Sequence, residues 1–332
     1  MLMSSVFAMP SSTSSDMPMP TGTTKSSGKT GGDIDILQFA LILEHLENAF
    51  YRQGTEKFGQ GDYTGFPLES KVIYQRFLEI ANHEETHVTA LNSTISGLGG
   101  NPVPPCEYEF NITDAKSFVA TSRILETVGA SAYLGQLPLV SGNDYKTAAG
   151  SIALVEARHS SFLNTLNKLS GFGNSFETPL GARSVVTLAS PFIKSCPFEL
   201  PIKPFNSLKL NKAMGSVGDE LYFDKSNATY CSFQSGLSTV WTSVKDNSTC
   251  VVPEGVSGDV FVHLTSDNST MLTNDTSSVV SGPTIVNVKM SEAMMKKMKN
   301  GEKYQQLNSS AMTLTLTSMC LFIALLSLLT TL

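Results

Sequence analysis

Apolar residues recur at intervals of three and four positions over residues 33–171, which is the spacing of a buried stripe on a helix. Clusters of glycine and proline interrupt this pattern and mark where each helix ends. The predicted helices run from Asp33 to the glycines between 54 and 61, and over 70–98, 114–137 and 143–170. Four long helices with a longer loop between the second and the third predict a four-helix bundle.

Helical spacing continues in a shorter apolar stretch at 176–193, which predicts a fifth helix packed against the bundle. After Pro201 the pattern changes to short apolar runs between Asn, Ser, Gly and Pro turns, as in antiparallel sheets. The predicted fold class is therefore α+β with two domains. These are a helical bundle at 33–198 and a small antiparallel, sandwich-like β domain at 199–290, followed by a linker at 291–308.

Both ends of the chain indicate the secretory route. Residues 1–8 resemble the end of a signal peptide, and the Ser-, Thr- and Pro-rich residues up to 32 predict a disordered linker. At the other end, a charge-free apolar tail over 309–332 matches a GPI-attachment signal, with Asn308 as the attachment residue. The alternative is a tail-anchored helix, although the apolar run is short for the roughly 20 residues that a membrane span needs.

Composition and cysteine usage agree with an extracellular protein at the plasma membrane or in the cell wall. The net charge of -6 argues against a nucleic-acid partner, and 41% hydrophobic residues suffice for real cores. Cys320 lies in the apolar tail, which leaves an even number of cysteines for disulfides: Cys106, Cys196, Cys231 and Cys250. N-glycosylation sequons begin at Asn92, Asn111, Asn227, Asn247, Asn268 and Asn274.

Two Glu-x-x-His motifs lie on the second and fourth predicted helices, and single glutamates lie on the first and third. Residues three apart share a helix face, so each motif can direct a carboxylate and an imidazole at one point. This order on four successive helices is the pattern of dinuclear carboxylate bundles, whereas one motif alone would indicate only a solvated face or a salt bridge. The predicted metal ligands are Glu44, Glu84, His87, Glu126, Glu156 and His159.

Charge explains why such a cluster requires metal. Four carboxylates inside one bundle would each lose several kcal/mol of solvation and repel one another, whereas two divalent cations would neutralise them. Oxygen-rich ligands with two imidazoles suit two Fe or Mn ions, without separating these from Zn. On the first helix Glu47 competes with the preferred Glu44, and Tyr51 lies two turns beyond Glu44 on the same face. His83 is an alternative ligand or a structural histidine.

Five stretches resemble a known family: LILEHLENAFY at 41–51, NHEETH at 82–87, NPVPPC at 101–106, EARH at 156–159 and FIKSCP at 192–197. They are similar to fungal secreted ferritin-like proteins, which are related to stress-response, late-sexual-development and desiccation-related proteins. The resemblance implies a ferritin-like fold and a hydrogen bond from Tyr51 to a ligand. It also implies the disulfides Cys106–Cys196 and Cys231–Cys250, among the three pairings that four cysteines allow.

Two functions agree with these features. The first is a di-iron or di-manganese oxidoreductase, in which Glu84 and Glu156 bridge the ions and the centre reacts with O2 or peroxide in a stress response. The second is a non-catalytic structural protein of the cell wall or cell surface with a vestigial metal site. Iron storage in a cage is disfavoured, because an appended β domain and a tether would obstruct its closure. The expected partners are metal ions and, through the GPI lipid, the outer leaflet or cell wall; a homodimer stays open.

Overall fold

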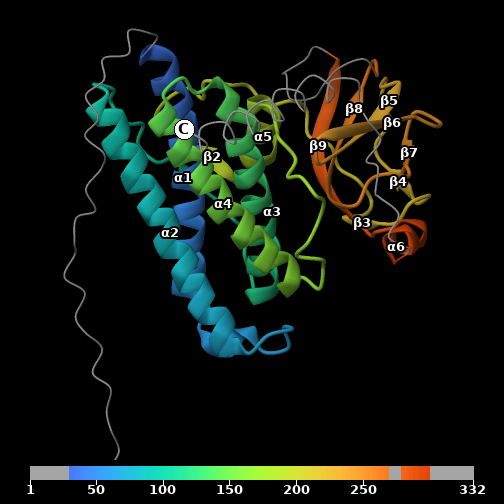
Figure 1. Cartoon of the computed structure of the whole chain (residues 1–332), viewed down its shortest axis with the longest axis horizontal. Helices are drawn as coiled ribbons and strands as arrows, with labels where there is room; N and C mark the ends of the chain where they lie inside the picture. The colour runs from blue at the N-terminus through green and yellow to red at the C-terminus, as the bar shows by residue number, and fades with distance from the viewer. Residues whose placement is uncertain (1–29, 269–277, 300–332) are drawn as a thin grey trace, which may run out of the picture.

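The computed structural model describes residues 30–268 and 278–299, and it places a helical bundle beside a β sheet (Figure 1). The predicted signal remnant, the sequon at Asn274, and the predicted anchor at Asn308 and 309–332 lie outside the described residues. None of the helices in the described ranges combines the length and the hydropathy that crossing a membrane requires.

The bundle consists of two helical hairpins, in which α1 packs on α2 and α3 packs on α4. The helices are α1 (Thr30–Lys57), α2 (Ser70–Gly97), α3 (Ala115–Gln136) and α4 (Asn143–Leu166), with 3-10 turns η1 (Gln60–Tyr63) and η2 (Leu137–Leu139) in the connections. α4 ends before the predicted Ser170, because Lys168 adopts a left-handed conformation with φ of 59°.

Local sequence determines where these helices begin and end. Asp114 caps α3: its Oδ1 accepts a hydrogen bond from the Ser117 backbone N–H at 2.7 Å. Gly99, with φ of 80°, follows the end of α2. Asp33 connects the hairpins, because its carboxylate accepts backbone hydrogen bonds from Ser141 and Gly142, just before α4.

Aromatic rings fill much of the bundle core. Phe50, Phe77 and Phe118 are fully buried, and the ring centroids of Phe77 and Phe118 lie 4.7 Å apart. Phe118 also packs against α1 at Gly54, where an added Cβ would lie 2.0 Å from the ring. This close approach of Phe118 to α1 requires glycine at position 54, because a larger residue would collide with the ring.

The fifth helix is shorter than the predicted 176–193. α5 covers Ala182–Ala189, the 3-10 turn η3 follows at Ser190–Phe192, and the strand β2 occupies Ile193–Ser195. Pro179 and Pro191 disfavour helical backbone in the residues before them, which restricts the helix to the segment between. Apolar spacing alone did not reveal these limits.

The residues after 201 form a five-stranded sheet of order β3-β9-β8-β5-β6. Its strands are β3 (Met214–Gly215), β5 (Tyr230–Ser235), β6 (Ser238–Ser243), β8 (Gly258–Thr265) and β9 (Val279–Val288). β3 runs parallel to β9, whereas the other pairings in this sheet are antiparallel. The predicted antiparallel arrangement thus holds for the main strands. The long stretch of chain between β3 and β9 permits the parallel exception.

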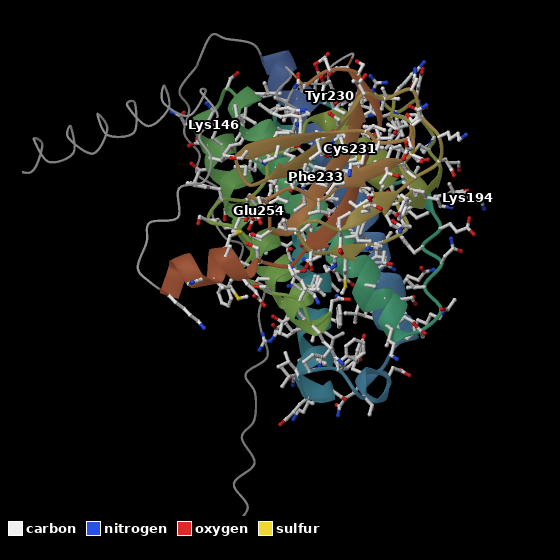
Figure 2. All side chains as sticks on the ribbon, turned by 90° about the vertical axis from the view of Figure 1, so that its right-hand side faces the viewer. Lys146, Lys194, Tyr230, Cys231, Phe233 and Glu254 are labelled. Carbon is white, nitrogen blue, oxygen red and sulfur yellow. A yellow bond between two sulfur atoms is a disulfide. The ribbon has the colours of Figure 1, made fainter. Side chains whose placement is uncertain are left out.

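A second β layer covers the outer face of this sheet, although it has only two strands, β4 (Glu220–Tyr222) and β7 (Thr249–Val251). Cys231 and Phe233, labelled on β5 in Figure 2, belong to the buried cluster between the layers, together with Leu221 of β4. The disulfide Cys231–Cys250 joins the layers. The predicted linker at 291–308 begins with a helix, α6 (Glu292–Lys299).

The second disulfide, Cys106–Cys196, lies beside a short antiparallel pairing of β1 (Glu107–Tyr108) with β2. It connects the loop after α2 to the segment after α5, across a sequence separation of 90 residues. Both pairings are those that the family resemblance implies.

The inner face of the sheet packs on the bundle, so the two regions share a core. Phe261 and Ile285 belong to the same buried apolar cluster as Phe118. An ion pair accompanies this contact, with Arg123 Nη1 of α3 2.6 Å from Asp259 Oδ1 of β8, both side chains being largely buried. His263 of β8 is completely buried, which lowers its pKa to about 3, and its Nε2 lies 3.1 Å from Ser184 Oγ of α5.

Candidate metal centre

The middle of the bundle holds two overlapping groups of buried side chains with metal-binding atoms. One group is Glu44, Glu84, His87 and Glu156, and the other is Glu84, Glu126, Glu156 and His159. Within each group, one such atom per residue lies within 4.8 Å of the others. Glu84 and Glu156 belong to both groups. The structure brings together all six residues that the sequence predicts as ligands.

The imidazoles contact the carboxylates through Nδ1. His87 Nδ1 lies 3.2 Å from Glu44 Oε2 and 3.1 Å from Glu84 Oε2. On the other side, His159 Nδ1 lies 3.0 Å from Glu126 Oε2. The atoms that share these protons are the ones that would hold a metal ion, so protons and cations compete for the same positions.

Two tyrosines hold the carboxylates of α1 and α3. Tyr51 of α1 donates its hydroxyl proton to Glu126 of α3, and Tyr133 of α3 donates to Glu44 of α1. The expected contact of Tyr51 with a ligand is present, but its acceptor lies on the opposite helix rather than on its own. Sequence reasoning missed Tyr133, although it follows Glu126 by seven positions as Tyr51 follows Glu44.

The two halves of the bundle differ at one pair of positions. Glu47 follows Glu44 by three residues, and the position that follows Glu126 by three is Gly129. A Cβ at Gly129 would lie 3.0 Å from Glu47 Oε1 and 2.5 Å from Glu156 Oε2. The glycine therefore leaves space for a fifth buried carboxylate. Glu47 lies beside the two four-residue groups rather than within them.

The remaining histidines near the centre contact it from outside. His83 Nδ1 lies 2.9 Å from His159 Nε2, the ring nitrogen that faces away from the carboxylates. This contact supports the orientation of the His159 ring. His45, by contrast, contacts the backbone carbonyl of Val103 through Nε2 at 3.1 Å and connects α1 to the loop after α2. His83 is thus placed as a partner of a predicted ligand, and His45 is structural.

Burial changes the proton affinities of these groups. It raises the pKa of Glu44 to about 7 and that of Glu156 well above the usual value. Burial acts on Glu84 too, but its interactions with His159 and His87 lower the pKa to about 2. Burial alone would lower the pKa of the two imidazoles, yet their carboxylate partners raise it to about 10 for His87 and about 9 for His159. In the metal-free protein, bound protons therefore neutralise part of the negative charge.

Several buried acceptors lack a hydrogen-bond partner. Both carboxylate oxygens of Glu156 are in this state. Oε1 of Glu84 also accepts no aligned hydrogen bond, although His159 Nδ1 lies 3.3 Å from it. His87 Nδ1 lies 3.5 Å from Glu156 Oε1 without aligning for a hydrogen bond. An unpaired buried acceptor costs about 1–3 kcal/mol, and more when it is charged. Because these atoms belong to the two residues shared by both groups, the donor set fits metal binding.

Comparison with known proteins agrees with this geometry. Residues 32–169 match the family model of the ferritin-like domain. The helical region is a ferritin-like bundle. The chain is also similar to Protein rds1 of Schizosaccharomyces pombe, with 25% identity over 168 residues. That similarity covers 50% of this chain and 40% of the relative, so the chain spans less than half of that protein's length.

We expect the metal-free protein to lose stability as the pH rises from 6.5 to 9. A histidine whose pKa is raised by folding stabilises the folded state fully at any pH below its unfolded pKa of 6.5. This contribution falls as the pH rises toward the folded pKa, which is about 9 for His159 and about 10 for His87. The raised pKa of Glu44 has the same sign, but its contribution is lost mainly between pH 4.5 and about 7, at the lower edge of this range. Thermal unfolding of chelator-treated protein, followed by circular dichroism, would then show a falling midpoint. A constant or rising midpoint would contradict this account.

A second prediction concerns the space beside Glu156. Gly129→Ala should weaken metal binding by about 10–100-fold, the usual effect of disturbing the residues that support metal ligands. Its Cβ would push against the carboxylates of Glu156 and Glu47. The control is Gly150→Ala in α4, where nothing lies within 4 Å of an added Cβ. Titration with Co²⁺, followed by absorbance, measures both variants, and equal affinity in Gly129→Ala and the parent protein would refute the steric argument.

Proposed function

We propose that this chain is an extracellular, GPI-anchored ferritin-like protein that binds two iron or manganese ions in its bundle and reduces O2 or hydrogen peroxide there. The observation that carries the proposal is the position of Glu84 and Glu156. Each lies in both groups of metal-binding atoms, and both have buried oxygens without hydrogen-bond partners. This arrangement is costly for carboxylates alone and favourable around a pair of divalent cations.

The residues around the proposed ligands have distinct roles. Tyr51 and Tyr133 hold the Glu126 and Glu44 carboxylates across the bundle, and His83 supports the ring of His159. Complete burial of the four carboxylates excludes bulk water and large substrates, which favours small oxidants. Two bound ions would supply Lewis acidity and one electron each for the reduction of a peroxide to water, and a second peroxide, oxidised to O2, would return these two electrons.

An extracellular location has separate support. Disulfides persist in oxidising compartments, and this chain has two, one in each region. The sequons at Asn111, Asn227, Asn247 and Asn268 lie at exposed positions, as a glycan requires. Asn92 is less suitable, because it is half-buried on α2 and its Nδ2 donates to the Val88 carbonyl at 2.9 Å.

The alternative is a non-catalytic cell-surface or cell-wall protein whose metal site is vestigial. One observation favours it: His87 and His159 can share protons with the surrounding carboxylates. These protons compensate part of the buried negative charge without metal. Metal content and activity toward O2 and peroxide together separate this function from the proposed one.

Elemental analysis of purified full-length protein should find about two Fe or Mn ions per chain. The double variant Glu84→Ala with Glu156→Ala lacks both carboxylates that are proposed to bridge the ions. It should bind no ions and consume no peroxide. Glu79→Ala on the exposed face of α2 is the control and should change neither. Folded parent protein that stays metal-free in metal-replete medium would exclude the proposed chemistry, and metal-loaded protein inert toward both O2 and peroxide would support the structural alternative.

The lipid anchor is tested independently. Phosphatidylinositol-specific phospholipase C should release the protein from isolated membranes, because a GPI anchor holds it only through the lipid. Truncation before residue 309 should give a protein that is secreted without membrane attachment. Resistance to the phospholipase with retention in the membrane would indicate the tail-anchored helix instead.

A further inference from the structure

A polar cavity of about 50 Å³ lies where the bundle meets the sheet, apart from the metal centre. Its walls come from α3, α4, the loop at 171–178 and β8. Hydroxyl groups of Ser131 and Ser161 contribute to the lining, together with Asn164, Glu177 and Asp259. Buried polar surface of this kind is stable only when its groups find hydrogen-bond partners.

Asn164 has a buried side-chain oxygen that lacks a hydrogen-bond partner. Its side chain is 8% exposed, and its Nδ2 donates to Asp259 Oδ2 at 3.1 Å. That bond fixes the orientation of the amide, which leaves Oδ1 buried at the cavity wall without a hydrogen-bond partner. The position calls for a donor, such as the hydroxyl group of a ligand.

The charges of the cavity restrict what it can bind. Asp259 is neutralised by Arg123 at 2.6 Å, while Glu177 lies exposed at the rim. The remaining carboxylate of Glu177 disfavours an anion. A metal ion is also disfavoured, because the closely spaced ligand groups found among the described residues are those of the bundle centre. A neutral or amine-bearing molecule with several hydroxyl groups remains.

One exposed aromatic side chain lines the cavity, and a second lies on the same loop. Phe176 lines the cavity and is 44% exposed, and Phe172 on the same loop is 90% exposed. The electron-rich face of such a ring attracts the C–H groups on one face of a sugar ring.

The loop that presents these groups is held at two points on the β region. Asn174 donates through Nδ2 to Ser235 Oγ at 2.7 Å and to the Ser257 carbonyl at 2.9 Å. Further along the loop, Thr178 Oγ1 accepts from the Gly236 backbone N–H at 2.7 Å. A loop fixed in this way loses little further conformational entropy when it binds a ligand.

We propose that this cavity is a carbohydrate-binding site for a single neutral or amine-bearing pyranose. A volume of about 50 Å³ holds roughly three or four water molecules, which corresponds to the hydroxyl edge of one sugar. In this arrangement a small shift of the cavity wall uncovers the buried Asn164 Oδ1, which then accepts a hydrogen bond from a sugar hydroxyl. A second hydroxyl donates to Glu177, and the face of the ring packs on Phe176. The site is independent of the proposed redox function.

Saturation-transfer NMR and calorimetry on the full-length protein test the proposal, with methyl α-D-glucopyranoside, methyl α-D-mannopyranoside, N-acetylglucosamine and glucosamine as probes. At least one probe should bind saturably with one site per chain. Phe176→Ala and Glu177→Gln, both at exposed positions, should each weaken binding by at least about tenfold, or ~1.4 kcal/mol.

Matched controls are Leu154→Ala, an exposed apolar residue of α4, and Glu254→Gln, an exposed glutamate of the β region (Figure 2). Both should bind like the parent protein, and so should Glu84→Ala with Glu156→Ala, since the metal centre takes no part. The proposal is overturned if no probe binds saturably, or if binding survives in both Phe176→Ala and Glu177→Gln.

Discussion

The burial of five carboxylates in the middle of one bundle is the constraint on which the rest of this structure depends. Glu44, Glu84, Glu126 and Glu156 are completely buried, and Glu47 is nearly so. No packing of apolar side chains compensates for such a charge, so each carboxylate needs a proton, a donor or a cation. Imidazoles, tyrosine hydroxyls and a glycine are arranged around them for this purpose, in a core that aromatic rings otherwise fill.

The two hairpins place similar residues around these carboxylates, and they differ at Gly129. Each hairpin provides a glutamate followed after seven residues by a tyrosine, and then a Glu-x-x-His motif. The tyrosine hydrogen bonds cross between α1 and α3, so each hairpin orients a carboxylate of the other. Gly129 breaks the repetition, because a side chain there would displace Glu47 and Glu156. The centre is therefore asymmetric in charge although nearly symmetric in its helices.

The β region contributes to the core of the bundle. Phe261 and Ile285 complete the bundle core, and the ion pair of Arg123 with Asp259 connects α3 to β8 in a largely buried setting. Removing one partner of such a pair leaves an uncompensated buried charge, so the contact specifies how the two regions join. The same junction encloses the polar cavity, because Asp259 orients both Arg123 and Asn164.

The sequence by itself determined the four long helices, the β strands that follow them and five of the six residues that meet in the bundle, because these depend on local periodicity and on spacing within a helix. On the first helix it favoured Glu44 over Glu47 without deciding between them. It overestimated the fifth helix, since apolar spacing does not weigh the prolines at 179 and 191. Contacts between helices were decided only by the tertiary structure. Tyr51 reaches Glu126 rather than a residue of its own helix, and the space for Glu47 depends on Gly129. The reason is physical: hydrogen-bond partners and free volume depend on how helices pack, and a one-dimensional pattern contains no such distances.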